Sequence, residues 1–181
     1  MDEGILIARA GHGDEEAFAQ LYARHQGPLY RYALHMCPQA ADDVVQEAFL
    51  AVIQRPDGYD ASRGTVAQYL FGIARRQVKR RIGDFHDPPV TDGDGVDENT
   101  PLDELIQIDS VARVRAAVDA LPPVFREVVV LCDLQEMTYH EAAAIVGCPI
   151  GTLRSRLHRG RVQLANRLAA APAAVGSGRR P

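Results

Sequence analysis

The chain has 181 residues, of which 46% are hydrophobic and 6% aromatic, and its formal net charge is −4 at pH 7. This length suits one ordinary domain or two small ones, and so few aromatics favour Ala-rich helices over a β-sandwich or barrel. The net charge argues against a simple histone-like basic protein, and no apolar run approaches the ~18 residues of a membrane span. The acidic start Met1-Asp2-Glu3-Gly4 lacks a signal-peptide layout, and three cysteines are too few for a secreted disulfide framework. We therefore predict a mostly helical cytoplasmic protein without membrane insertion.

Apolar periodicity predicts two helices at the start of the chain. Residues 14–36 carry apolar side chains at spacings of three, four and seven, which is typical of an amphipathic helix. Gly27-Pro28 is expected to kink or split it, because proline removes a helical hydrogen bond. Pro38 is suited to the first turn of a second helix, whose apolar stripe runs from Ala41 to Ile53.

A loop and a third helix follow. Pro56-Asp57-Gly58 ends the second helix and begins a loop that runs to Gly64. Thr65 is a suitable cap for the third helix, and Gly83 closes it. Residues 1–83 are therefore predicted to form one small helical domain.

Residues 84–104 are predicted to be a flexible acidic linker. Glycine, proline and acidic residues dominate them, so they bury too little apolar surface to offset the entropy of ordering. Helical periodicity returns from Leu105 to Leu121 and again from Phe125 to Cys132. We expect a second helical domain over 105–168 and a disordered tail over 169–181.

Charge is strongly segregated along the chain. Residues 63–81 contain six basic residues and no acid, residues 84–109 nine acids and no Lys or Arg, and residues 151–167 five arginines and no acid. The two basic runs could be solvated helix faces. Because both coincide with helical patterns, we favour contact with one long polyanion at two places.

Residues 138–168 fit a helix-turn-helix. Thr138 and Glu141 have the spacing of a capping box, and Gly147 suits the left-handed position after a short helix. A second, basic helix runs from about Ile150 to Leu168, with leucines on its buried side. Such a helix fits the major groove of DNA, where arginine pairs with guanine edges. The alternative is a helical hairpin with a solvated arginine face.

Other chemistry is sparse. The chain has no Gly-rich phosphate loop, nucleophile elbow or HExxH pattern. Cys132, His140 and Cys148 match no usual zinc spacing. Asp42 and Asp43 point to different sides of a helix, so they are poor acid–base partners. We therefore predict no metal and no cofactor.

Two segments resemble an extracytoplasmic-function sigma factor of the sigma-70 family. The stretches DEEAFAQLYARHQGPLYRYAL, ADDVVQEAFLAVI and RGTVAQYLFGIARRQVKRRI resemble sigma region 2, and LPPVFREVVVLCDLQEMTYHEAAAIVGCPIGTLRSRLHRGRVQL resembles region 4. The resemblance implies a subunit that joins core RNA polymerase, directs it to promoters and has no enzymatic activity of its own. It further implies contact with single-stranded −10 DNA and duplex −35 DNA, and an anti-sigma factor as regulator.

The same resemblance assigns residues to three surfaces. Contacts with core polymerase fall on Asp42, Asp43, Gln46 and Glu47. Contacts with the −10 strand fall on Tyr59, Arg63, Arg75, Arg76, Lys79 and Arg80. Contacts with the −35 duplex fall on Thr152, Arg154, Ser155, Arg156, Arg159 and Arg161. The family commonly has Trp at Tyr69 and Asn at Arg76, so this chain departs from it beside the −10 strand.

Two other functions remain open from the sequence. A stand-alone helix-turn-helix regulator would bind duplex DNA without polymerase, usually as a dimer on a palindrome, but no dimerisation helix is evident. A non-DNA adaptor would use the acidic helix to sequester regulators.

Overall fold

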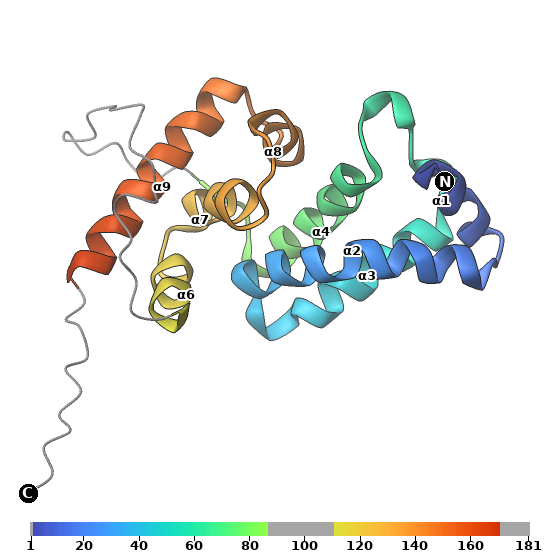
Figure 1. The fold of residues 1–181 in the computed structure, drawn as a ribbon, viewed down its shortest axis with the longest axis horizontal. Helices are drawn as coiled ribbons and strands as arrows, with labels where there is room; N and C mark the ends of the chain where they lie inside the picture. Colours follow the sequence, from blue (N-terminus) through green and yellow to red (C-terminus); the bar gives the residue numbers. More distant parts are fainter. Residues whose placement is uncertain (1, 87–110, 171–181) are drawn as a thin grey trace, which may run out of the picture.

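The computed structural model describes residues 2–86 and 111–170, which we call the N-terminal half and the C-terminal half. Throughout these residues the ordered elements are helical (Figure 1). This confirms the all-α fold class. The predicted linker and tail lie mostly outside the described residues.

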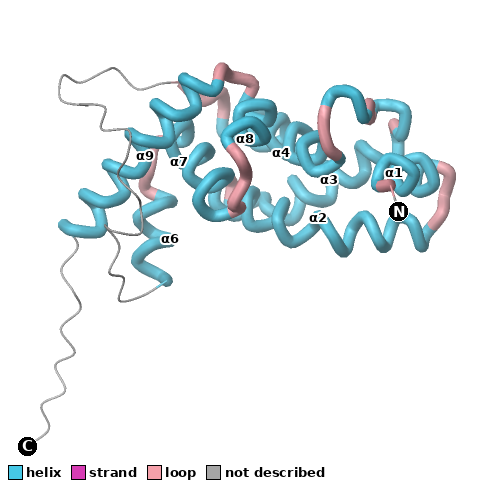
Figure 2. Tube along the Cα trace, turned by 45° about the horizontal axis from the view of Figure 1, so that its top comes forward, coloured by secondary structure: helices cyan, strands magenta, loops and turns pink. Residues whose placement is uncertain are grey.

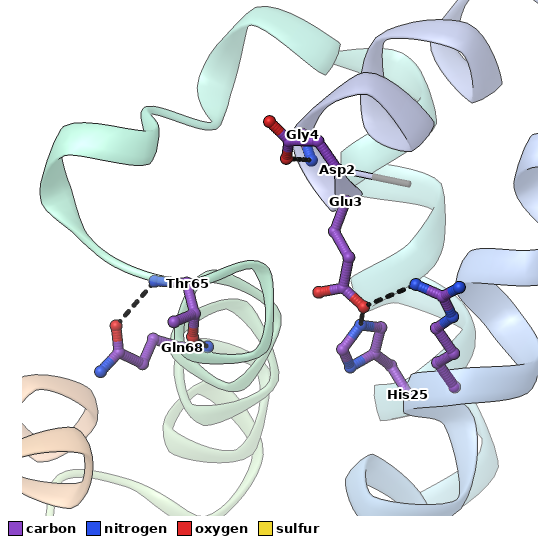
Figure 3. Close-up of polar contacts among 7 residues, drawn as sticks. Asp2, Glu3, Gly4, His25, Thr65 and Gln68 are labelled. Atoms are coloured by element: carbon purple, nitrogen blue, oxygen red, sulfur yellow. Dashed lines mark hydrogen bonds and ion pairs between the residues drawn. The ribbon is translucent and has the colours of Figure 1, made fainter.

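The N-terminal half is built from four α-helices. They are α1 (Glu3–Gly11), α2 (Glu15–Met36), α3 (Ala41–Gln54) and α4 (Val66–Ile82). Helix α1 is not in the sequence-based prediction, and it covers α2 with the buried side chains of Leu6, Ile7 and Ala10. Its start is set by Asp2, whose carboxylate accepts a hydrogen bond from the Gly4 amide (Figure 3).

The expected split of α2 at Gly27-Pro28 is wrong. One helix continues through Pro28 to Met36. The carbonyl that loses its partner belongs to Arg24, an exposed position where water can satisfy it. Leu21, Leu29 and Tyr32 stay on one buried face across the proline, so packing holds the helix together.

The C-terminal half contains α6 (Val111–Asp119), α7 (Pro123–Val129), α8 (Tyr139–Val146) and α9 (Ile150–Ala170). The helix expected over Phe125–Cys132 begins earlier, at Pro123, and changes to a π-helical turn, η4 (Val130–Leu134). This wider turn brings Asp133 toward α9, as described below.

The two halves pack against each other. Their apolar side chains form one buried core that includes Tyr32, Leu70 and Val78 from one half and Val128 and Leu131 from the other. Helix α8 lies beside α4 in both views (Figures 1 and 2). No helix among the described residues is long and apolar enough to cross a membrane.

Candidate functional site

A cavity of about 430 Å³ lies between α4 and the loop that precedes it. Tyr59, Arg63 and Arg76, all predicted as DNA contacts, are in its wall. The tyrosine ring faces that of Tyr69 across 5.7 Å between centroids. Aromatic faces beside arginine side chains form the kind of surface on which unpaired bases stack while their phosphates are neutralised.

Local hydrogen bonds fix the shape of this loop. The Tyr59 hydroxyl donates to the Gly64 carbonyl oxygen over 3.1 Å. Partial burial raises the pKa of Tyr59, so the hydroxyl keeps the proton it donates. Thr65 and Gln68 then form a full capping box, in which the Thr65 amide donates to Gln68 over 2.8 Å (Figure 3). The sequence predicted Thr65 as the cap.

Gly58 allows the loop to approach α4 closely. A Cβ atom at this position would lie 2.5 Å from the Tyr69 hydroxyl oxygen, nearer than any side chain tolerates. A larger residue at this position would therefore require the loop or the Tyr69 side chain to shift.

A second cavity of about 290 Å³ adjoins the first. Arg55 and Arg76 line both cavities, and Arg80 lines the second. Arg55, Arg63, Arg76 and Arg80 thus make one basic surface, which we call the basic groove. Such a concentration of positive charge attracts a polyanion.

Two of the predicted −10 contacts lie outside the basic groove. Arg75 turns toward the C-terminal half, where its guanidinium donates two hydrogen bonds to Glu127, over 2.8 and 3.2 Å. Lys79 pairs with Asp84 at the end of α4. Both cations are therefore bound to carboxylates in this structure.

The predicted polymerase contacts share the outer face of α3. Asp42, Asp43 and Gln46 are exposed and Glu47 is half-buried, while Val44, Val45 and Ala48 point into the core. Arg81 from α4 holds the Glu47 carboxylate at 2.6 Å. Leu50, with 43% of its surface exposed, extends this acidic face with an apolar side chain.

Helices α8 and α9 form the predicted helix-turn-helix. The Thr138–Glu141 capping box is complete, and Gly147 is left-handed with φ of 71°. Leu153, Leu157 and Leu164 bury one side of α9. Successive residues are about 100° apart on a helix, so Ser155 and Arg159 lie roughly opposite the leucines. These predicted base contacts therefore share the outward face.

The other predicted −35 contacts are distributed around this face. Thr152 and Arg156 flank it on one side, and Arg154 and Arg161 flank it on the other. The Arg154 guanidinium lies 5.6 Å from the centre of the Tyr139 ring, a cation–π contact that restricts its position.

Arg161 is engaged within its own half. It donates two hydrogen bonds to Asp133 in the π-helical turn, over 2.6 and 3.2 Å. The hydrogen bond with Asp133 raises the pKa of Arg161. The pair ties α9 to η4, the turn that follows α7.

The described residues offer little for metal binding or for nucleophilic chemistry. Among residues 2–86 and 111–170 no group of His, Cys, Asp or Glu side chains could hold a metal ion. Burial raises the pKa of the Cys132 thiol to about 12, so the reactive thiolate is scarce at neutral pH.

Sequence reasoning missed several residues of the first cavity. Arg55, Gln68 and Tyr69 line it but are absent from the predicted contacts. Arg55 directly precedes the loop at Pro56 and is the last residue before the turn, a signal that could have found it. Tyr139, whose ring lies against Arg154, is likewise absent from the predicted contacts.

These features define a helical protein with a basic groove, an exposed acidic face on α3 and a helix-turn-helix. A family model described as sigma-70 region 2 matches residues 21–84, and one described as sigma-70 region 4 matches residues 112–164. The chain is 31% identical over 189 aligned residues to the ECF RNA polymerase sigma-E factor of Escherichia coli K12, with 93% of this chain and 95% of that protein covered.

Two further comparisons agree. The ECF RNA polymerase sigma factor SigE of Mycolicibacterium smegmatis is 36% identical over 168 residues, which are 87% of this chain and 65% of that protein. The solved structure of CnrH in complex with the cytosolic domain of CnrY has a TM-score of 0.69 and 28% identity, covering 94% of this chain and 99% of that one. The chain belongs to the extracytoplasmic-function sigma factors of the sigma-70 family. As an RNA polymerase sigma factor it directs transcription initiation, binds polymerase and DNA, and is not an enzyme.

Proposed function

We propose that this sigma factor recognises promoters through two separate surfaces. The basic groove and the Tyr59–Tyr69 pair hold the unpaired −10 strand, and the outward face of α9 reads the −35 duplex. The observation that carries the proposal is the cavity between the loop and α4, whose wall combines the tilted Tyr59–Tyr69 ring pair with the side chains of Arg55, Arg63 and Arg76. Bases stack on the rings, and phosphates meet the guanidinium groups.

Core polymerase docks on the acidic face of α3 in this proposal. Asp42, Asp43 and Gln46 are exposed there, and Glu47 is oriented by Arg81. Carboxylates on a rigid helix pair with basic groups of a partner and steer its approach. Since polymerase acts on the chromosome, we place the protein in the cytoplasm.

The test is transcription in vitro with purified sigma-free core polymerase. Fragmented DNA of the source genome serves as template, and RNA 5′ ends are sequenced. We expect defined starts that require the protein and share two upstream elements. Sequence-selective duplex binding without polymerase, and no starts, would instead support a stand-alone regulator.

Matched variants assign the surfaces. Arg76→Ala should weaken binding of a −10 single strand. It should also lower the slope of the logarithm of the binding constant against the logarithm of the salt concentration by roughly 0.7 per lost phosphate contact, whereas Arg24→Ala on α2 should not.

Asp43→Asn should weaken assembly with core polymerase. Glu15→Gln is its control, because it too removes an exposed acid from the first turn of a helix. Equal effects of variant and control would reject the assignment.

An anti-sigma factor is proposed as a further partner. CnrH is solved in complex with the cytosolic domain of CnrY, and the family resemblance implies such a regulator for this chain. A purified protein that binds this chain one to one and abolishes the mapped starts would qualify. One that binds without changing transcription would not.

A further inference from the structure

Among the residues that the structure describes, Glu127 is the one charged residue that is fully buried, with 1% of its surface exposed. It belongs to α7 in the C-terminal half, but its side-chain partners belong to the N-terminal half. The Tyr32 hydroxyl donates to one carboxylate oxygen over 2.8 Å. Arg75 donates to both oxygens, over 2.8 and 3.2 Å. We call these three residues the Glu127 latch.

Other polar contacts cross the same boundary. Arg126 donates to the His35 carbonyl oxygen over 3.1 Å, and the His35 ring lies 2.7 Å from Asp119. Ala144 of α8 contributes to the wall of the cavity that also contains Tyr59 and Arg63. The C-terminal half therefore contributes to the wall of the basic groove in this structure, in which α8 lies beside α4 (Figure 2).

Arg75 lies at the edge of the surface that faces this cavity. It follows Gln68 and Gly72, which line the cavity, by seven and three positions along α4, and residues so spaced share a helix face. Arg76 next to it lines both cavities. A DNA strand that runs along this face of α4 would reach Arg75 next after Arg76. In this structure, however, the Arg75 guanidinium points to Glu127.

A buried ion pair suits a contact that must open. Removing two charges from water costs about as much as their attraction returns, so a complete pair adds little net stability. Removing one partner is far more disruptive, because the other charge stays desolvated. When the halves separate, both charges regain water. The latch thus gives one specific closed arrangement without making it permanent.

We propose that Glu127 competes with promoter DNA for Arg75. In the closed form its carboxylate occupies the guanidinium and α8 restricts the groove. In the open form Arg75 is available to a phosphate of the −10 strand. This inference rests on the proposed assignment of the −10 strand to the basic groove. Because the closed form binds the strand poorly, the apparent affinity falls in proportion to the open fraction, and one open molecule in ten means tenfold weaker binding.

The test compares full-length wild type with Glu127→Gln, Tyr32→Phe and Glu3→Gln. Glu127→Gln removes the charge that holds Arg75, and Tyr32→Phe removes only one hydroxyl donor, a milder change. Glu3→Gln is the matched control: it also neutralises a glutamate, but one whose ion-pair partners Arg24 and His25 lie within the N-terminal half (Figure 3). Small-angle X-ray scattering gives the radius of gyration. Fluorescence anisotropy gives affinity for a labelled single strand taken from a mapped −10 element.

We expect Glu127→Gln to enlarge the radius of gyration and to tighten strand binding about five- to tenfold. Tyr32→Phe should change both measurements in the same direction, about two- to threefold in affinity, and Glu3→Gln should change neither. Unchanged dimensions and affinity in both latch variants would overturn the proposal. So would equal tightening by Glu3→Gln, since the effect would then be net charge alone.

The proposed function is judged separately. If Glu127→Gln expands the molecule but binding is not tighter, while Arg76→Ala still weakens it, the competition is refuted and the −10 assignment stands. If no strand binds with any dependence on Arg76, the −10 assignment itself fails.

Discussion

Gly160 lies where α9 packs closely against α7, and we predict that Gly160→Ala destabilises the protein. An added Cβ would lie 2.8 Å from a side-chain carbon of Val129 and 3.3 Å from the Phe125 carbonyl oxygen. Val129 is fully buried and β-branched, so it cannot rotate away. Overpacking of this kind costs about 1–3 kcal/mol, whereas replacing glycine by alanine in a helix gains up to about 1 kcal/mol. The net expectation is a loss of about 1 kcal/mol.

Gly151→Ala in the first turn of the same helix is the matched control. No atom lies within 4 Å of a Cβ built there, so this variant should be neutral or slightly more stable. The difference between the two variants isolates the steric cost, about 1–3 kcal/mol. Urea unfolding followed by circular dichroism at 222 nm measures it. Equal midpoints for the two variants would refute the close crossing of α7 and α9.

Three further predictions follow from single groups. Cys132, with a pKa of about 12, should be alkylated by iodoacetamide at pH 8 far more slowly in the native protein than in urea, as followed by mass spectrometry; equal rates would contradict its burial. Asp14 has a lowered pKa because the Ala17 amide donates to its carboxylate. The Asp14 carboxylate therefore stabilises the protein above its unfolded pKa of about 3.9, and this stabilisation is lost as the pH falls through the lower pKa of the folded state. Asp14→Asn should flatten the dependence of stability on pH in this range. An unaltered pH dependence would reject this role. Tyr139→Leu removes the ring beneath Arg154. It should reduce discrimination between −35 sequences in competition binding while leaving the α-helical circular dichroism signal unchanged, and undiminished discrimination would contradict the positioning role.

Features set by local chemistry were predictable from the sequence. Thr65 and Thr138 cap their helices as expected, and Gly147 adopts its left-handed conformation, because cap and turn preferences depend on residues within three or four positions. The buried side of α9 follows from its leucine spacing. The acidic face of α3 is exposed for the same reason.

Features set by packing were not predictable in the same way. Helix α1 is only nine residues long, so its apolar pattern is too short to predict a helix. The helix is stabilised by its packing against α2. Pro28 remains helical because apolar contacts on both sides of it outweigh the missing hydrogen bond. Arg75 and Glu127 lie 52 positions apart, and periodicity shows which face of a helix is apolar but not which face of another helix it meets.

The contact between Arg75 and Glu127 also limits how freely the parts of this sigma factor can be exchanged. A chimaera that received its C-terminal half from a relative would place a different side chain opposite Arg75 and Tyr32. An apolar residue there would leave a guanidinium desolvated between the halves, and a basic one would repel it. Engineered sigma factors that combine −10 and −35 specificities would therefore need α7 to be chosen together with α2 and α4, so that this carboxylate is inherited with its partners.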